Sequence, residues 1–133
     1  MTEKLEGSCF CGAVAYEADG LSTPIGHCHC RTCQKTHSAA FATTARTPYE
    51  GFAWTRGADV VANIESSPGK LRWFCPKCGT HLVAEKPAEK VRILRVGSID
   101  SPLPSKPVVH IWTSHKADFF DFEDGLPQFE EFP

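Results

Sequence analysis

Seven cysteines in three short groups constrain this chain more than any other feature of its sequence. The groups hold two, three and two cysteines, namely Cys9 and Cys11, then Cys28, Cys30 and Cys33, then Cys75 and Cys78. An odd number of cysteines cannot all pair as disulfides, and clusters with this spacing are typical of metal sites. The sequence therefore predicts that bound metal, rather than disulfide bonds, organises the fold.

The two outer pairs together supply four thiolates, which is a common ligand set for a structural zinc ion. Each pair is followed by a glycine, Gly12 or Gly79, and glycine tolerates the backbone conformation that such a turn requires. We therefore expect one zinc ion to join the N-terminal part of the chain to the region near residue 75. Its ligands are Cys9, Cys11, Cys75 and Cys78.

The middle group, Cys28, Cys30 and Cys33, offers three ligands and leaves a fourth position for water or substrate, as catalytic zinc sites do. Two alternatives stay open. A second structural zinc could be completed by His27, His29 or His37. A thiol redox pair could form between Cys28 and Cys33, although zinc would occupy the same sulfurs.

Three thiolates leave zinc with a formal charge of about −1, so such a site generates hydroxide poorly but can hold a substrate thiol as its thiolate. A thiolate nucleophile implies an electrophile such as an aldehyde. The cations Arg31 and Lys35 lie beside this group in the sequence and would offset the charge of a fourth thiolate. This pattern predicts a zinc enzyme acting on thiol adducts of aldehydes. The alternative is a non-catalytic zinc β-module that binds a protein or nucleic acid, but such a scaffold needs only the four-cysteine site.

The histidines near the middle group could relay a proton, because histidine titrates in the useful range. His29 is expected to point away from the metal that its neighbours bind, since alternate side chains of a Cys-x-Cys hairpin diverge. We expect His81 to be an ordinary strand residue and His110 to be a hydrogen-bonded core histidine.

Short apolar runs between Gly, Pro, Ser and Asp predict an all-β fold in a single domain of residues 1–133. The expected strands are Gly12–Ala18, Ala39–Arg46, Phe52–Arg56, Asp59–Asn63, Lys70–Phe74, Thr80–Glu85, Val91–Val96 and Val108–Trp112. The proline-rich segment Ser101–Pro107 is expected to be an extended connection. In the segment Asp118–Pro127, which has room for one helical turn, the phenylalanines are expected to pack on the core or cover an edge.

The formal net charge of −2 gives no general attraction to nucleic acid or to an anionic membrane. No apolar stretch approaches the roughly 18 residues of a membrane span, and residues 1–7 lack the apolar core of a secretion signal. We therefore expect a cytoplasmic protein with neither a nucleic-acid nor a membrane partner. In that compartment thiols stay reduced, which favours metal binding.

Three motifs resemble those of the glutathione-dependent formaldehyde-activating enzyme family, which includes centromere protein V-like proteins. They are Gly7–Val14, His27–Lys35 and Phe74–Thr80, and the segments His110–Trp112 and Asp124–Pro127 extend the resemblance. The resemblance implies coiled β-sheets around a structural zinc, called a β-tent, with two zinc ions per chain. It assigns Cys9, Cys11, Cys75 and Cys78 to structural zinc and Cys28, Cys30 and Cys33 to catalytic zinc.

The same resemblance implies glutathione and formaldehyde as substrates. They would be joined reversibly as S-hydroxymethylglutathione, which is a carbon–sulfur lyase reaction in the breaking direction. One departure from the family pattern is Phe119–Phe120, where members often carry a tryptophan before the Asp-Gly-Leu-Pro stretch.

Overall fold

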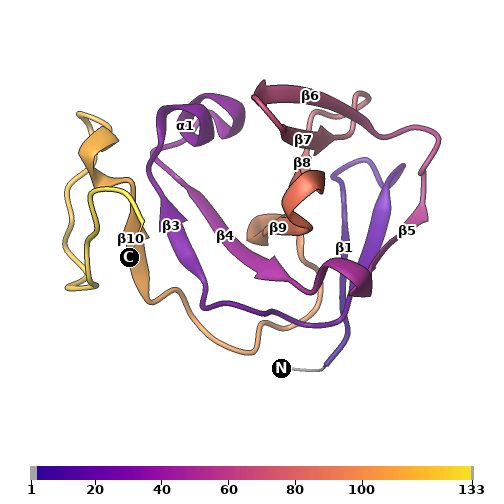
Figure 1. The fold of residues 1–133 in the computed structure, drawn as a ribbon, viewed down its shortest axis with the longest axis horizontal. Coiled ribbons are helices and arrows are strands. Elements are labelled where there is room, and N and C mark those ends of the chain that lie inside the picture. Colours follow the sequence, from indigo (N-terminus) through magenta and orange to yellow (C-terminus); the bar gives the residue numbers. More distant parts are fainter. Residues whose placement is uncertain (1–2, 133) are drawn as a thin grey trace.

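The computed structural model describes residues 3–132, and within that range ten strands form two sheets (Figure 1). The smaller sheet is antiparallel and has the strand order β1-β2-β5. Its strands are β1 (Leu5–Ser8), β2 (Ala15–Ala18) and β5 (Phe52–Arg56). The first hairpin of the chain therefore belongs to this sheet, and its turn contains the first two cysteines.

The larger sheet has seven strands in the order β10-β3-β4-β9-β8-β7-β6. They are β3 (Gly26–Cys28), β4 (Ala42–Thr47), β6 (Ala62–Ser67), β7 (Lys70–Phe74), β8 (His81–Lys86), β9 (Val91–Arg95) and β10 (Val109–Ile111). Its neighbours are antiparallel except β10 and β3, which run parallel and pair Ile111 with Cys28. Strand β10, near the end of the chain, thus pairs with β3, the strand that leads into the middle cysteine group.

One α-helix, α1 (Arg31–His37), corrects the expectation of a purely β fold. It begins at Cys30, whose Sγ accepts the backbone N–H of Cys33, and it ends at Ser38 in a left-handed conformation. Seven residues make only about two turns, which is too short to show an apolar period of 3.6 residues. Four 3-10 turns complete the regular structure: Tyr49–Gly51, Pro87–Glu89, Val96–Ser98 and Thr113–His115.

Each of the eight expected segments overlaps a strand, and β5 and β7 have the predicted bounds. The segment Asp59–Asn63 was placed too early, because β6 begins only at Ala62. β1 and β3 were missed, since four and three residues are too few to establish alternation. The connection from Ser101 to Pro107 contains no helix or strand, as its prolines predict.

The two faces of the larger sheet differ in chemistry. On one face Ala45, Leu94 and Val83 are successive cross-strand partners and pack into the main core with Tyr16. The residues that alternate with them point to the opposite face, which carries Lys and Arg side chains at positions 46, 70, 72, 86 and 95. The first face holds the two sheets together, each large apolar side chain contributing about 1.5–3 kcal/mol. The second face is available for a binding site.

Among residues 3–132, no helix has both the length and the apolar character needed to cross a membrane.

Candidate metal centres and active site

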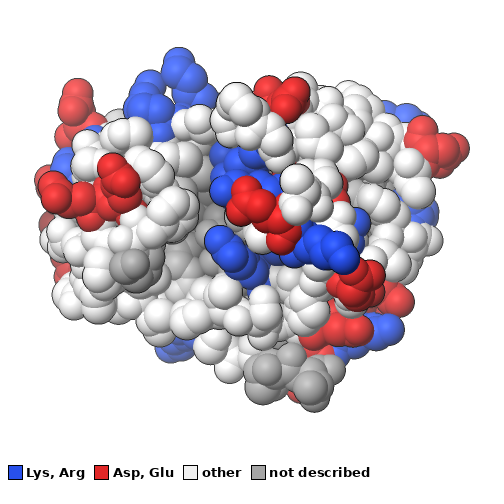
Figure 2. All heavy atoms as spheres, viewed as in Figure 1, with Lys and Arg blue, Asp and Glu red and all other residues white. Residues whose placement is uncertain are grey.

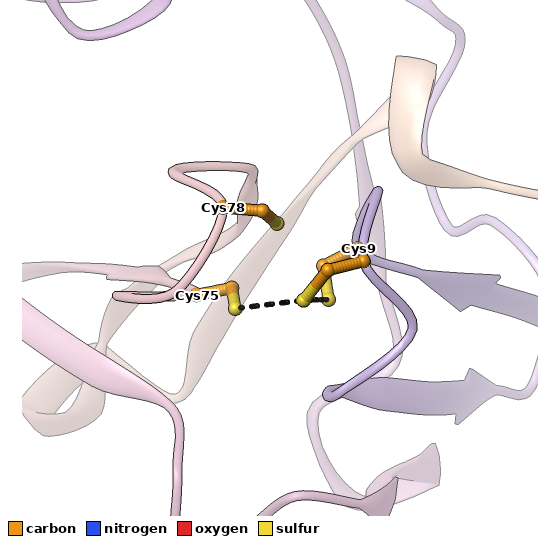
Figure 3. A group of neighbouring side chains, drawn as sticks. Cys9, Cys75 and Cys78 are labelled. Carbon is orange, nitrogen blue, oxygen red and sulfur yellow. Dashed lines mark hydrogen bonds between the residues drawn. The ribbon is translucent and has the colours of Figure 1, made fainter.

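The two outer cysteine pairs meet at the turns of two hairpins, one from each sheet. Cys9 and Cys11 follow β1, and Cys75 and Cys78 connect β7 to β8. Figure 3 shows the side chains of the two turns facing one another. Their four Sγ atoms lie within 4.8 Å of one another, with 3.7 Å between Cys9 and Cys11 and 3.8 Å between Cys11 and Cys75. A tetrahedral zinc with bonds of about 2.3 Å spaces its sulfurs by about 3.8 Å, so these residues fit one zinc ion.

The glycines that follow these pairs have the backbone conformation that the sequence predicts. Gly12 and Gly79 have φ values of +81° and +85°. Their N–H groups donate to the carbonyl oxygens of Cys9 and Cys75, at 3.1 and 2.7 Å, and so close each turn. Only glycine takes up this region without a steric penalty. The local sequence of each turn therefore favours the conformation that the structure shows.

The middle group is built on one short segment rather than on two distant ones. Cys28 ends β3, Cys30 caps α1 and Cys33 lies in its first turn, and their Sγ atoms lie within 4.8 Å of one another. Hydrogen bonding by Cys28 and Cys30 lowers the pKa of Cys33, and the charges of Arg95 and Arg72 lower it further. Three thiolate donors fit a zinc ion with one position left for another ligand.

No histidine between residues 3 and 132 brings a ring nitrogen into this three-sulfur group. His29 is fully buried and points away from the three sulfurs, as predicted. Its Nε2 shares a 2.8 Å hydrogen bond with His110 Nδ1. His110 is buried and its Nε2 contacts Asp124 Oδ2 at 2.8 Å, which confirms a hydrogen-bonded core histidine. Burial lowers the pKa of His29 to about 4, so this histidine is neutral at pH 7.

The other candidate histidines also lie apart from the sulfurs. His27 bonds to the hydroxyl of Thr43, while the rings of His37 and His81 lie 5.2 Å apart. His81 is the first residue of β8 and stacks on Phe74, as expected of an ordinary strand residue. The structure therefore gives no support to a second structural zinc completed by histidine.

The phenylalanines near the end of the chain divide into two kinds. Phe120 and Phe122 pack on His29 with ring centroids 5.4 and 5.2 Å away, which is the packing role that the sequence predicts. Phe119 is 78% exposed and takes no part in this cluster. The segment forms turns rather than a helix.

A cavity of about 370 Å³ lies against the middle cysteine group. Ile93, Ile111 and Trp112 form an apolar wall, and the described part of the chain contributes six lysine and arginine residues, one histidine (His115) and no acidic residue. The lysines and arginines are Arg31, Arg46, Lys70, Arg72, Lys86 and Arg95. Figure 2 shows Lys and Arg side chains gathered beside a hollow near the middle of one face, with acidic side chains also present at the surface.

Two of these cations, Arg72 and Arg95, are buried, with 2% and 5% of their surface exposed. Arg72 places Nη1 and Nη2 at 3.9 and 4.0 Å from Cys33 Sγ, and its Nε donates to Ser66 Oγ at 2.9 Å. Arg95 donates no side-chain hydrogen bond to any residue between 3 and 132, and its Nη2 is buried without a partner. No motif in the sequence points to either residue as part of a site.

The cations expected from the sequence have other surroundings. Arg31 lines the cavity and donates to Gln34 Oε1, whereas Lys35 is not among the cavity's lining residues. The three ion pairs found among residues 3–132 are Lys4–Glu17, Arg92–Glu85 and His110–Asp124. None of them involves a lysine or arginine that lines the cavity. The cavity therefore presents uncompensated positive charge beside three thiols, an arrangement suited to an anionic thiol.

The family model of the glutathione-dependent formaldehyde-activating enzyme matches residues 4–115. The chain belongs to this family. A Halomonas elongata protein described provisionally as a member is 30% identical over 128 residues, which cover 90% of this chain and 81% of the relative. The crystal structure of a Rhodobacter sphaeroides protein, 25% identical, matches with a TM-score of 0.60 over 74% of this chain and 91% of that one.

Proposed function

We propose that this protein is a zinc-dependent carbon–sulfur lyase-type enzyme that joins glutathione and formaldehyde as S-hydroxymethylglutathione and cleaves the adduct in reverse. Cys9, Cys11, Cys75 and Cys78 would hold a structural zinc within coiled sheets of the β-tent type. Cys28, Cys30 and Cys33 would hold the catalytic one. One observation carries the proposal: within residues 3–132, three sulfurs without a fourth protein ligand open onto a cavity lined by six lysine and arginine residues and by no acidic residue. Family membership supports the same reaction.

When bound at Cys28, Cys30 and Cys33, zinc would supply the charge that keeps a substrate sulfur deprotonated at neutral pH. The contact of Arg72 with Cys33 Sγ offsets part of the negative charge that thiolates accumulate there. This guanidinium is buried, so its interaction is screened less than that of an exposed pair.

The rest of the cavity suits the body of glutathione. At pH 7 glutathione carries two carboxylates and one ammonium group. Arg31, Arg46, Lys70 and Lys86 line the cavity with charges that can pair with those carboxylates, and arginine can do so in bidentate geometry. A volume of about 370 Å³ is within the range of small-molecule sites, and Ile111 and Trp112 give the cavity an apolar wall.

The alternative of a non-catalytic zinc module explains the cavity less well. A buried cation without a partner costs several kcal/mol, and a scaffold gains nothing from placing one beside three thiols.

All seven cysteines are free thiols, which supports the expected cytoplasmic setting.

Calorimetric titration of the zinc-loaded protein with glutathione tests the proposal. We expect binding to the wild type, loss of binding in Cys30→Ala, and retention in Lys35→Gln, whose side chain lies outside the cavity. Carbon-13 NMR should show that the wild type accelerates exchange between formaldehyde and its glutathione adduct. Equal heat and affinity for wild type and Cys30→Ala would contradict the proposed site.

A further inference from the structure

The two buried arginines of the cavity differ in how their charge is used. Arg72 contacts Cys33 Sγ and Ser66 Oγ. Arg95 comes from β9, the strand next to β4, and lines the same cavity, yet its guanidinium donates to no residue between 3 and 132. One cation is thus already paired with sulfur, and the other retains its hydrogen-bond donors.

Arg95 lines the same cavity as the three cysteines, and it is the cross-strand partner of Thr44, which pairs in turn with Gly26 of β3, two residues before Cys28. Burial lowers the pKa of Arg95, and the thiolates of Cys33, Cys28 and Cys30 oppose that shift. A guanidinium nevertheless stays protonated, because its ordinary pKa is above about 12. It therefore places a fixed positive charge and an unpaired Nη2 at the cavity that the three cysteines line.

The proposed reaction moves a negative charge. When a thiolate adds to an aldehyde, the sulfur lone pair forms the S–C bond and the C=O π pair moves to oxygen. The charge passes from sulfur to an alkoxide oxygen, which then takes a proton from water. The proton released when the thiol ionises balances the one taken up, so the overall addition consumes none. Cleavage runs through the same alkoxide in the opposite order.

Catalysis requires a group that stabilises negative charge on the alkoxide oxygen more than on the thiolate sulfur. Arg72 is engaged with Cys33 Sγ and so offsets charge on a ligand sulfur rather than on the substrate oxygen. We propose that Arg95 is a catalytic residue that binds the alkoxide oxygen of the thiol–aldehyde adduct. This assignment rests on the proposed function for the identity of the reaction. Arg95 acts through charge and hydrogen bonds and does not donate its own proton.

Two thioethers of glutathione test this role by binding alone. S-carboxymethylglutathione carries an anionic oxygen close to sulfur, and S-carbamoylmethylglutathione has the same shape without the charge. Neither has a free thiol, so the comparison does not depend on chemistry at the metal. We expect the wild type to bind the carboxylate about tenfold more tightly than the amide, because charge-assisted hydrogen bonds are the stronger kind. Arg95→Gln should abolish this preference.

The control is Arg46→Gln, which removes an exposed cation of the same cavity. It should weaken both thioethers by a similar factor and keep their ratio. In turnover, Arg95→Gln should lower kcat by about 10²-fold with little change in the KM for glutathione, since it removes an interaction specific to the transition state. If Arg95→Gln fails to fold, Arg95→Met removes the same charge with an apolar side chain suited to burial.

Each outcome decides a different question. Equal affinity of the two thioethers for wild type, or an unchanged ratio in a folded Arg95 variant, overturns the role of Arg95 and leaves the proposed function standing. Failure of both thioethers to bind a wild type that does bind glutathione likewise overturns the role of Arg95. Failure of glutathione itself to bind the zinc-loaded wild type overturns the proposed function. A preference that disappears only in the Arg95 variants supports the assignment.

Discussion

The two cysteine groups have similar sulfur geometry but opposite surroundings. The outer four come from the turns of two hairpins, one in each sheet, and their polar neighbours are backbone N–H groups and the Thr80 hydroxyl. The middle three come from the six residues 28–33, with two buried arginines and a cavity beside them. Thiolates alone therefore do not define the chemistry of a site. The neighbours of the sulfurs distinguish the two groups. Backbone groups of two turns suit a site that holds the fold together, whereas buried arginines and a cavity suit a site that holds a substrate.

The largest difference should appear when one ligand is removed from each group. Structural zinc contributes on the order of 10 kcal/mol to folding, whereas a whole domain is stable by only about 5–15 kcal/mol. Cys75→Ser should therefore give insoluble or thermally fragile protein, because it releases the contact between the two sheets. Cys30→Ser should fold but lose thiol–aldehyde activity and one zinc ion. Melting curves with metal analysis would refute the distinction if both variants collapsed alike.

Metal occupancy should separate the same two groups by affinity. We expect two zinc ions per chain in zinc-replete protein, and the three-sulfur site should lose its ion first as a chelator is added, since it has fewer protein ligands. Native mass spectrometry during the titration should pass through a one-zinc species that still melts like the starting protein. A single zinc with four freely alkylated thiols in replete protein would contradict two sites.

A smaller effect tests whether local backbone shape supports the four-cysteine site. Gly79→Ala places a Cβ at φ +85°, which should cost about 1–2 kcal/mol and lower the melting temperature. Gly97→Ala is the matched control, because an added Cβ there also meets open space and its φ is not in the left-handed region. Equal melting temperatures for the two variants would show that the turn does not depend on this conformation.

The grouping of the cysteines could be predicted because each group is local in sequence. The turn glycines and the roles of His29 and His110 followed from equally short patterns. Arg72 and Arg95 could not be found this way, since their nearness to Cys33 depends on the order of strands in the larger sheet. Arg72 alternates with Leu71 and Trp73 along β7 and therefore points to the opposite face of the sheet. However, a polar position on a half-buried strand normally faces water, whereas here the opposite face is covered as well.

The parallel pairing of β10 with β3 also affects how the protein is made. His29 and His110 are 81 residues apart, so during synthesis the middle cysteines emerge long before the strand that covers β3. Until β10 docks, β3 is an open sheet edge whose unpaired N–H and C=O groups can recruit another chain. Long-range parallel contacts also form slowly. Substitutions at Asp124 and His110, which lie far from either cysteine group in sequence, should therefore increase the aggregation of newly made chains. The chains that do fold should still bind metal.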